Sequence, residues 1–375
     1  MTSPPEVGFL YVTRLPPSPS GVALYASVFA EVLETLGDVT VVRLPAAPTS
    51  SQSLWCGVRL ARDLRHVTQL HPDSILVVEI AGRGVAEFWA AWALSRSRGR
   101  RVWLTVHDAP ALSGGAFFTA WLDRRGGRRL AAALSGTLGA AAERGLLARA
   151  DRVLCLSNRG ARALEQHYRL SRHVDHVPHV AHPTTSAARG RREILVPGYV
   201  GSERDFLPLI RLLPALPVEW TLVVGACSAE AKRRALTEAY CAQVADRVRM
   251  LGFCTEEEIQ AAFDRAAVVA RWRRDGWVAS PGSPGSFAVS GPLISAMGNG
   301  CAIVTNDNRG LAESFADAGV MTVADGDTGE QEMVDAVRRL VFDEHDRVER
   351  GETGRRHAQQ VHSVLAVADV VRGFV

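Results

Sequence analysis

The sequence has little lysine, little net charge and no long apolar run, and each shortage excludes a class of protein. Lys232 is the only lysine among 43 basic residues, a bias typical of a GC-rich genome. A net charge of +3 over 375 residues does not favour a nucleic-acid partner. No apolar run approaches the roughly 20 residues that span a bilayer, and residues 1–7 lack the features of a signal peptide. We therefore expect a cytoplasmic protein.

Paired cysteines and metal-ligand spacing are also missing. The six cysteines show no CxxC spacing, so we expect reduced thiols rather than disulfides or zinc. His179 and His182 lie three residues apart on a segment expected to be extended. This spacing points them to opposite faces, so we expect no metal site. With 47% hydrophobic and 22% charged residues, the chain is expected to fold, and its length favours two domains.

Strand and helix patterns alternate along the first half of the chain. Strands are expected as runs of β-branched residues, and helices as segments with apolar residues at helical spacing. The expected strands are 7–12, 39–44, 75–80, 102–106 and 153–156. The expected helices are 22–36, 54–70, 84–98 and 128–149. This order predicts a parallel sheet of the Rossmann type.

The pattern stops at a linker without periodicity, 184–193, and then starts again. Further strands are expected at 194–197, 221–225, 247–251, 267–270, 302–305 and 320–323. Further helices are expected at 205–213, 228–243, 256–265, 292–298, 309–316 and 328–342. We therefore predict an α/β fold with a Rossmann-like domain at 1–183, a second at 194–353, and a C-terminal helix within 354–375 that crosses back. The two doubly wound domains should face each other across a cleft.

A Gly-, Pro- and Ser-rich loop, 280–291, precedes one of the expected helices. Ser290 is a candidate N-cap, and Pro292 falls in the first turn, where its missing N–H costs nothing. The start of a helix after such a loop presents backbone N–H groups and a positive dipole end. This arrangement favours an anion such as the phosphates of a nucleotide.

Several of these loops together resemble one family. The stretches 198–206, 222–225 and 248–259, followed by 280–313, are similar to the second half of GT-B glycosyltransferases, especially the retaining GT4 class. In the front half, the stretch Pro16-Pro-Ser-Pro-Ser-Gly-Val-Ala-Leu-Tyr25 resembles the acceptor-side glycine loop of that class. Val106-His107-Asp108 resembles its histidine at a strand end. The ordered set, rather than any single motif, carries the resemblance.

The resemblance implies the GT-B fold and transfer of a sugar from a nucleotide-sugar, with UDP favoured over GDP. The expected acceptor is a glycan, a lipid-linked saccharide or a natural product. The anomeric configuration should be retained, with no metal or other cofactor, and catalysis should be electrostatic and accompanied by domain closure.

The resemblance also assigns residues. His107 should orient the donor sugar, and Arg204 should bind the diphosphate, while Tyr199 stands where the family usually has an arginine. Among the arginines at 271, 273 and 274, Arg271 is our candidate for the missing cation. The catalytic candidates are therefore His107, Arg204 and Arg271. The donor-binding candidates are Ser20, Gly21, Gly198, Tyr199, Gly225, Phe253, Ser290, Gly291, Pro292, Leu293, Ser295 and Glu313.

The two glutamates that the family usually has, eight positions apart, are missing. Phe287 and Ser295 lie near their positions. A non-catalytic GT-B subunit that binds a nucleotide-sugar is therefore an alternative. A sugar-nucleotide epimerase is a weaker one, because the loops 13–21 and 280–291 contain no carboxylate.

The first domain has a basic region, formed by the arginines from Arg124 to Arg129 together with Arg144, Arg149 and Arg152. It allows peripheral contact with the inner face of a membrane. A solvated face is the commoner explanation, since few large apolar residues are interleaved.

Overall fold

The computed structural model describes residues 7–16, 21–44, 53–81, 85–96, 99–112, 135–184, 190–200, 202–277 and 286–375. The chain divides into two compact units. The first consists of Met1–His179, Ala279–Val289 and Val367–Val375, and the second of Val180–Val278 and Ser290–Ala366. The short segment ending at Val289 therefore groups with the first unit, although it lies between two strands of the second.

The first unit is built on a parallel sheet in the order β2-β1-β3-β4-β5-β6. Three of its strands, β1, β3 and β4, are buried along their whole length. This burial explains why they appear in the sequence as continuous apolar runs rather than as alternating patterns. The strands are β1 (Phe9–Thr13), β2 (Val39–Arg43), β3 (Ile75–Ile80), β4 (Val102–Val106), β5 (Arg152–Cys155) and β6 (Asp175–His176).

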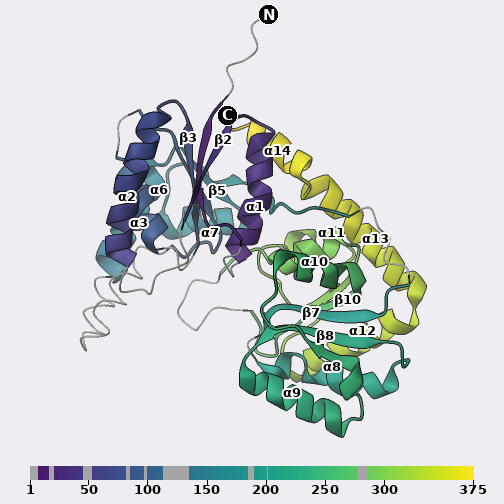
Figure 1. Cartoon of the computed structure of the whole chain (residues 1–375). Coiled ribbons are helices and arrows are strands. Elements are labelled where there is room, and N and C mark those ends of the chain that lie inside the picture. The colour runs from purple at the N-terminus through teal and green to yellow at the C-terminus, as the bar shows by residue number, and fades with distance from the viewer. Residues whose placement is uncertain are drawn as a thin grey trace, which may run out of the picture. The chain divides into compact units, whose positions relative to one another are not determined.

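Helices flank this sheet on both faces (Figure 1). They are α1 (Gly21–Glu34), α2 (Ser53–Leu70), α3 (Val85–Leu94), the π-helix η2 (Ser135–Gly139), α6 (Ala140–Arg149) and α7 (Asn158–Tyr168). α2 and α3 pack against each other. The sequence patterns did not predict α7, although the Ser157 hydroxyl caps it by accepting from the Gly160 N–H at 3.1 Å. Its surface is mostly polar, which hides the helical spacing.

The second unit has a parallel sheet in the order β12-β11-β10-β7-β8-β9. Its strands are β7 (Glu193–Val200), β8 (Thr221–Cys227), β9 (Val248–Met250), β10 (Ala266–Arg271), β11 (Ala302–Thr305) and β12 (Met321–Thr322). Together the two sheets confirm the predicted α/β class with two doubly wound parallel sheets.

Helices also cover both faces of the second sheet. In Figure 1, α8, α9 and α12 lie on one face, and α10 and α11 on the other. α13 packs against α11 and β11. The helices are α8 (Leu207–Leu212), α9 (Ala229–Cys241), α10 (Glu256–Arg265), α11 (Gly291–Gly298), α12 (Gly326–Phe342) and α13 (Glu344–Val361). Single 3₁₀ turns are η3 (Glu203–Asp205), η4 (Leu213–Ala215), η5 (Ala245–Arg247) and η6 (Ala312–Ser314).

Two helix predictions are wrong. The segment 309–316 forms only η6, because Leu311 and Phe315 are buried one helical turn apart and imitate a longer amphipathic pattern. The predicted tail helix, 354–372, is two helices, α13 and α14 (Val364–Arg372). α13 begins ten residues earlier than expected, where the Asp343 carboxylate accepts from the Asp346 N–H at 2.9 Å. Its sequence is so polar that no apolar period marks it.

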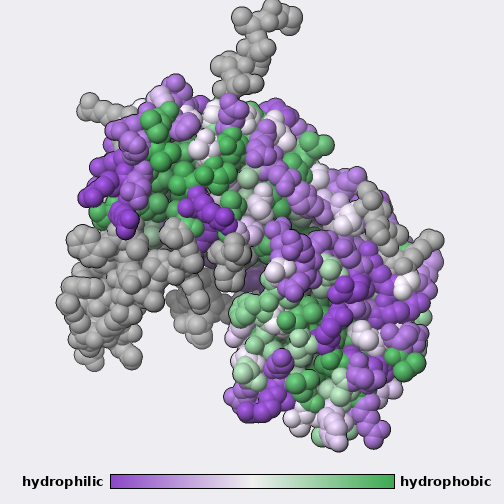
Figure 2. Space-filling model, viewed as in Figure 1, coloured by the Kyte–Doolittle hydropathy of each residue, from purple (hydrophilic) through white to green (hydrophobic). Residues whose placement is uncertain are grey.

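Among the described residues, no helix is both long and apolar enough to cross a membrane. Hydrophilic residues cover much of the visible face of each unit (Figure 2).

Candidate functional site

Each sheet has one place where the direction of chain progression reverses. In the first unit this switch point lies between β1 and β3, and in the second between β7 and β10. Connections on the two sides of such a point run to opposite faces of the sheet, which leaves a crevice at the carboxyl ends of the strands. Ligands of open α/β sheets bind in such crevices.

In the first unit, a buried histidine and a buried carboxylate meet at this end. His107 follows β4, and its Nε2 lies 2.5 Å from Oε2 of Glu79, the fifth residue of β3. Glu79 is only 3% exposed. The Tyr11 hydroxyl, from β1, donates to its other oxygen at 2.7 Å. Three adjacent parallel strands therefore bring together three polar side chains that lie far apart in the sequence.

Aromatic rings enclose this group. The Tyr25 ring, from α1, packs in a T-shaped arrangement against His107 and His179, with ring centroids 4.9 Å apart in each case. Burial, reinforced by the negative charge of Glu79, raises the pKa of Tyr11 and of Tyr25 well above the usual tyrosine value. Both hydroxyls therefore stay protonated. The Tyr25 hydroxyl is buried without a hydrogen-bond partner among the described residues.

The remaining predicted residues of the first unit are placed less completely. Ser20 lies outside the described residues. Gly21 is exposed at the start of α1, and a Cβ added there would meet no atom within 4 Å. Phe287, near the position of a missing glutamate, belongs to the first unit. Its N–H donates to the Ala109 carbonyl at 2.8 Å, and its carbonyl accepts from the Ser157 hydroxyl at 3.1 Å.

In the second unit, two predicted glycines allow a close approach of the neighbouring strands β7 and β8. The register of β7 with β8 shifts between Val196 and Tyr199, and Gly198 adopts the left-handed region with φ +79°. A Cβ at Gly225 would lie 2.4 Å from the Gly198 carbonyl oxygen. A bulge of this kind needs residues without side chains at both positions.

The Arg271 guanidinium fills the space beside this bulge. A Cβ at Gly198 would lie 3.3 Å from its Nη1 and 3.6 Å from Cγ of Pro292. Nη1 donates to the Pro197 carbonyl at 3.2 Å, whereas the buried Nε has no hydrogen-bond partner among the described residues. The side chain is 14% exposed. Burial lowers the pKa of Arg271 to about 10, and Asp307, with its carboxylate 3.9 Å from Nε, opposes that effect.

Two more arginines gather around Trp277, close to Arg271. The guanidinium carbons of Arg271, Arg309 and Arg273 lie 4.4, 4.7 and 5.0 Å from the centre of the Trp277 ring. Arg309 forms a two-pronged pair with Asp307, at 2.7 and 2.9 Å. Arg271 and Arg309 therefore share the Asp307 carboxylate, while Arg273 interacts electrostatically with Asp205. This Trp277 cluster has a surplus of positive charge at the carboxyl ends of β10 and β11.

Arg274 is the arginine of this stretch that the Trp277 cluster leaves out. It forms ion pairs with Asp327 and Glu330 of α12, so its charge is already balanced. The geometry thus distinguishes Arg274 from Arg271, the arginine of this stretch that the sequence analysis preferred.

The start of α11 lies next to the bulge. Pro292 is in the first turn, as predicted. Ser290 takes the N-cap position, but its hydroxyl makes no capping hydrogen bond and is buried without a partner among the described residues. The amides of Leu293 and Ile294 already donate to the Ser290 carbonyl, at 3.0 and 3.2 Å. Gly291 is half-buried, and the Leu293 side chain belongs to the core.

Other predicted donor-binding residues of the second unit are exposed or half-buried. Tyr199, near the end of β7, is 61% exposed, and Phe253, in the turn after β9, is 77% exposed. Arg204 is exposed in η3, and Glu313 is exposed in η6. Ser295 is half-buried within α11, and its carbonyl accepts from the Asn299 side chain at 2.9 Å. Exposure leaves the first four side chains accessible to a ligand.

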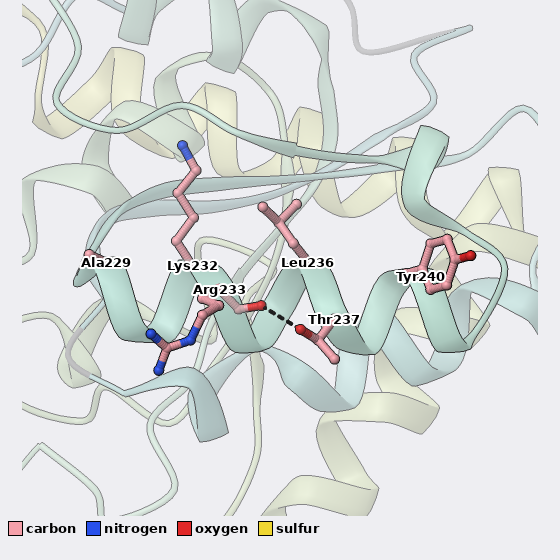
Figure 3. A pocket seen from close by; sticks show the side chains of 6 residues that line it. All are labelled: Ala229, Lys232, Arg233, Leu236, Thr237 and Tyr240. Carbon is pink, nitrogen blue, oxygen red and sulfur yellow. Dashed lines mark hydrogen bonds between the residues drawn. The ribbon is translucent and has the colours of Figure 1, made fainter.

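Two hollows on the second unit add little to this site. The hollow in Figure 3 is lined by α9 alone, so it has a wall on one side only; its residues are Ala229, Lys232, Arg233, Leu236, Thr237 and Tyr240. The other lies beyond β11 and β12 and borders the Trp277 cluster through Asn306. The Asn306 amide already bonds to Arg273, Trp277 and Asp325. It therefore has a structural role.

Within the described residues, no three His, Cys, Asp or Glu side chains gather as a metal site would require.

The sequence patterns missed Glu79 and the residues that gather around Arg271. A signal for Glu79 was available, because it is the one charged residue within the apolar run 75–80. No comparable signal marked Trp277, Asp307 or Arg309, since exposed loops commonly contain such residues.

Comparisons with known proteins agree with this architecture. A family model described as a glycosyl transferase 4-like domain matches residues 11–184, and one described as glycosyl transferase-like matches residues 211–371. No curated protein of similar sequence was found.

Solved structures match over nearly the whole chain. HepE of Anabaena in complex with UDP has 13% identity, covers 97% of this chain and 98% of its own, and has a TM-score of 0.67. Sucrose-phosphate synthase of Thermosynechococcus elongatus has 15% identity, 96% coverage of each chain and a TM-score of 0.66. A glycosyltransferase of Rickettsia africae has 11% identity, covers 97% and 96%, and has a TM-score of 0.64.

Two six-stranded parallel sheets, each with its own switch point, define the GT-B fold of these structures. The two family models, one on each half, identify the chain more closely. It belongs to the GT4-like glycosyltransferases and is an enzyme of that class.

Proposed function

We propose that this enzyme transfers a sugar from a UDP-sugar to a saccharide, lipid-linked saccharide or small natural-product acceptor, with retention of anomeric configuration. The second unit would bind the donor, and no metal or organic cofactor would take part. His107 of the first unit would orient the transferred sugar.

The observation that carries this proposal is the surplus of positive charge around Arg271. Its guanidinium lies beside the Gly198 bulge at the switch point of the second sheet. A buried cation with an unpartnered N–H is costly unless an anion neutralises it. The departing diphosphate of a nucleotide-sugar is such an anion, and a pre-arranged arginine would stabilise its charge as it develops.

Arg204 and Tyr199 would complete the phosphate end of the site. Arg204 is exposed and can reach outward with a forked guanidinium. Tyr199, where the family usually has an arginine, adds no charge, which is why a cation from β10 would be needed. The exposed aromatic ring of Phe253 would offer a surface for the base.

The preference for UDP is supported by the HepE structures, which contain UDP and, in one case, UDP-glucose. Isothermal titration with UDP and with GDP tests it directly. We expect UDP to bind more tightly, and we expect UDP-sugars to be slowly hydrolysed when no acceptor is present. Binding of neither nucleotide would contradict the proposal.

Retention and the acceptor need separate experiments. Once an acceptor supports turnover, proton NMR of the first product formed reports its anomeric configuration. We expect the same configuration as in the donor; the opposite one would exclude retention. Turnover unaffected by EDTA would agree with a metal-independent reaction.

Contact with a membrane is a separate prediction. In the first unit, Arg149 donates to the Gly145 carbonyl, and Arg152 pairs with Asp175 and lies over the Phe374 ring. The arginines from 124 to 129 lie outside the described residues. Sedimentation with anionic vesicles at low and high salt tests the prediction, and equal binding to neutral vesicles would contradict it.

A further inference from the structure

The first unit holds a buried carboxylate whose position calls for an explanation. Glu79 lies in an otherwise apolar strand and is 3% exposed. A buried carboxylate costs several kcal/mol unless donors satisfy its oxygens. Tyr11 donates to one oxygen, and His107 faces the other. Glu79 therefore occupies a buried strand position whose neighbours along the strand are all apolar, which points to a role beyond stability.

The contact between Glu79 and His107 selects one form of the imidazole. A carboxylate can only accept, so Nε2 must carry the proton and donate it to Oε2. In the neutral ring the lone pair is then at Nδ1. Without a fixed partner, a histidine would exchange between its two tautomers.

Further contacts hold the ring in place. The His107 N–H donates to the Ile80 carbonyl at 3.0 Å, which ties its backbone to the end of β3. The plane of the Tyr25 ring is nearly perpendicular to the imidazole plane, at an angle of 87°. The ring is therefore fixed in position and plane, while Glu79 fixes the location of its proton.

We propose that Glu79 is a positioning residue for glycosyl transfer. It holds His107 with the proton on Nε2, so that Nδ1 accepts a hydrogen bond from a hydroxyl group of the transferred sugar. This rests on the proposed function for the use of His107, whereas the tautomer itself can be measured without any turnover.

Glu79→Gln is the informative variant. It keeps the size of the side chain, but its amide can donate to Nε2 and so favours the opposite tautomer. We expect nitrogen-15 NMR of histidine-labelled protein to show His107 as the Nε2–H form in the native enzyme, and a shift towards Nδ1–H in Glu79→Gln. The His107→Asn variant identifies the signal among those of the eleven histidines.

The kinetic readout separates positioning from binding. We expect Glu79→Gln to lower kcat for UDP-sugar hydrolysis about tenfold, the size seen when partners that orient a functional histidine are lost. The Kd for UDP should stay unchanged, because the proposed UDP site lies on the second unit. If the protein proves too unstable, Glu79→Asp keeps the charge but shortens the side chain, and a mixture of tautomers is expected.

A matched control is available in the same unit. The Glu143 carboxylate is buried and accepts from the Tyr168 hydroxyl at 2.9 Å. Glu143→Gln should lower the Tm to a similar extent without moving the His107 signal. A His107 signal unchanged in Glu79→Gln, or an equal loss of kcat in both variants, would overturn the proposal. A native enzyme that binds no UDP would instead overturn the proposed function, and the His107 signal would still decide the role of Glu79.

Discussion

The two switch points of this enzyme lie at equivalent places in two parallel sheets, but a buried carboxylate stands at the first and a group of arginines at the second. At the first, a buried carboxylate is satisfied by a tyrosine and a histidine and enclosed by aromatic rings. At the second, three guanidinium groups surround one tryptophan, and two of them share the Asp307 carboxylate. In the first, donors within the group satisfy the oxygens of the carboxylate, whereas the second has more positive than negative charge.

This difference teaches how one type of fold can serve two tasks. A balanced group with fixed hydrogen bonds suits the orientation of a neutral sugar hydroxyl, because little reorganises when the ligand arrives. An unbalanced cationic group suits a phosphate, because the ligand completes the neutralisation. Substitutions at each site show whether the two sites divide the work in this way.

Loss of the Arg271 guanidinium should have the largest effect. We expect Arg271→Ala to reduce kcat for UDP-sugar hydrolysis about 100-fold or more, the usual range when one pre-arranged donor to a developing anion is removed. Steady-state kinetics and UDP titration measure the effect. Arg265→Ala, at the last residue of α10 just before the same strand, is the control, because Arg265 pairs there with Glu193. Equal behaviour of the two variants would end the assignment.

Loss of the His107 imidazole should come next. Removing one hydrogen bond of about 1.5 kcal/mol corresponds to roughly a tenfold lower kcat. The Kd for UDP should not change in His107→Ala if the two sites are separate in function. A weaker Kd with an unchanged kcat would mean that the first unit takes part in binding the nucleotide.

Loss of Arg204 should be smaller, because its side chain is exposed. Charge pairs in solvent contribute about 1 kcal/mol or less, so Arg204→Ala should lower turnover by roughly fivefold at most, and increasingly little at high salt. Turnover at saturating donor that matches the native enzyme would show that Arg204 does not stabilise the leaving group.

The pH dependence of anion binding should be the smallest effect over the accessible range. Because the pKa of Arg271 is lowered to about 10, its charge is present below that pH and is lost above it. Sulfate is the better probe, since its charge does not change in alkali, whereas both the uracil ring and pyrophosphate ionise there. We expect the affinity for sulfate to fall as pH rises through about 10, and earlier in Arg271→Lys, where burial would lower an already lower pKa.

Rising pH should increase the contribution of Arg271 to the free energy of unfolding, although it lowers the affinity for the anion. Between the folded and unfolded pKa values of Arg271, the unfolded chain holds more protons, so this group stabilises the fold as pH rises. Tyr199→Phe is the control for binding, because it removes the exposed phenol near the site. If the pH effect disappeared in that variant, Arg271 would not be the group responsible for it.

Much of the fold could be predicted from local patterns. Strands such as Ile75–Ile80 and Val102–Val106 were located because parallel strands buried on both faces must be apolar throughout. The short helix after the glycine-rich loop was located through Pro292. Helices with polar surfaces, such as α7 and the start of α13, were missed or misplaced, because tertiary packing and capping rather than periodicity specify them.

The residues of the candidate sites show a sharper division. The sequence alone determined which loops follow the strands, and hence that His107 and Arg271 stand at strand ends. Only the tertiary structure decided that Glu79 meets His107, and that Trp277 and Asp307 surround Arg271. These pairs depend on which strands become neighbours and in what register. Strand order in a parallel sheet is set by long crossovers and core packing, so sequence spacing does not contain it.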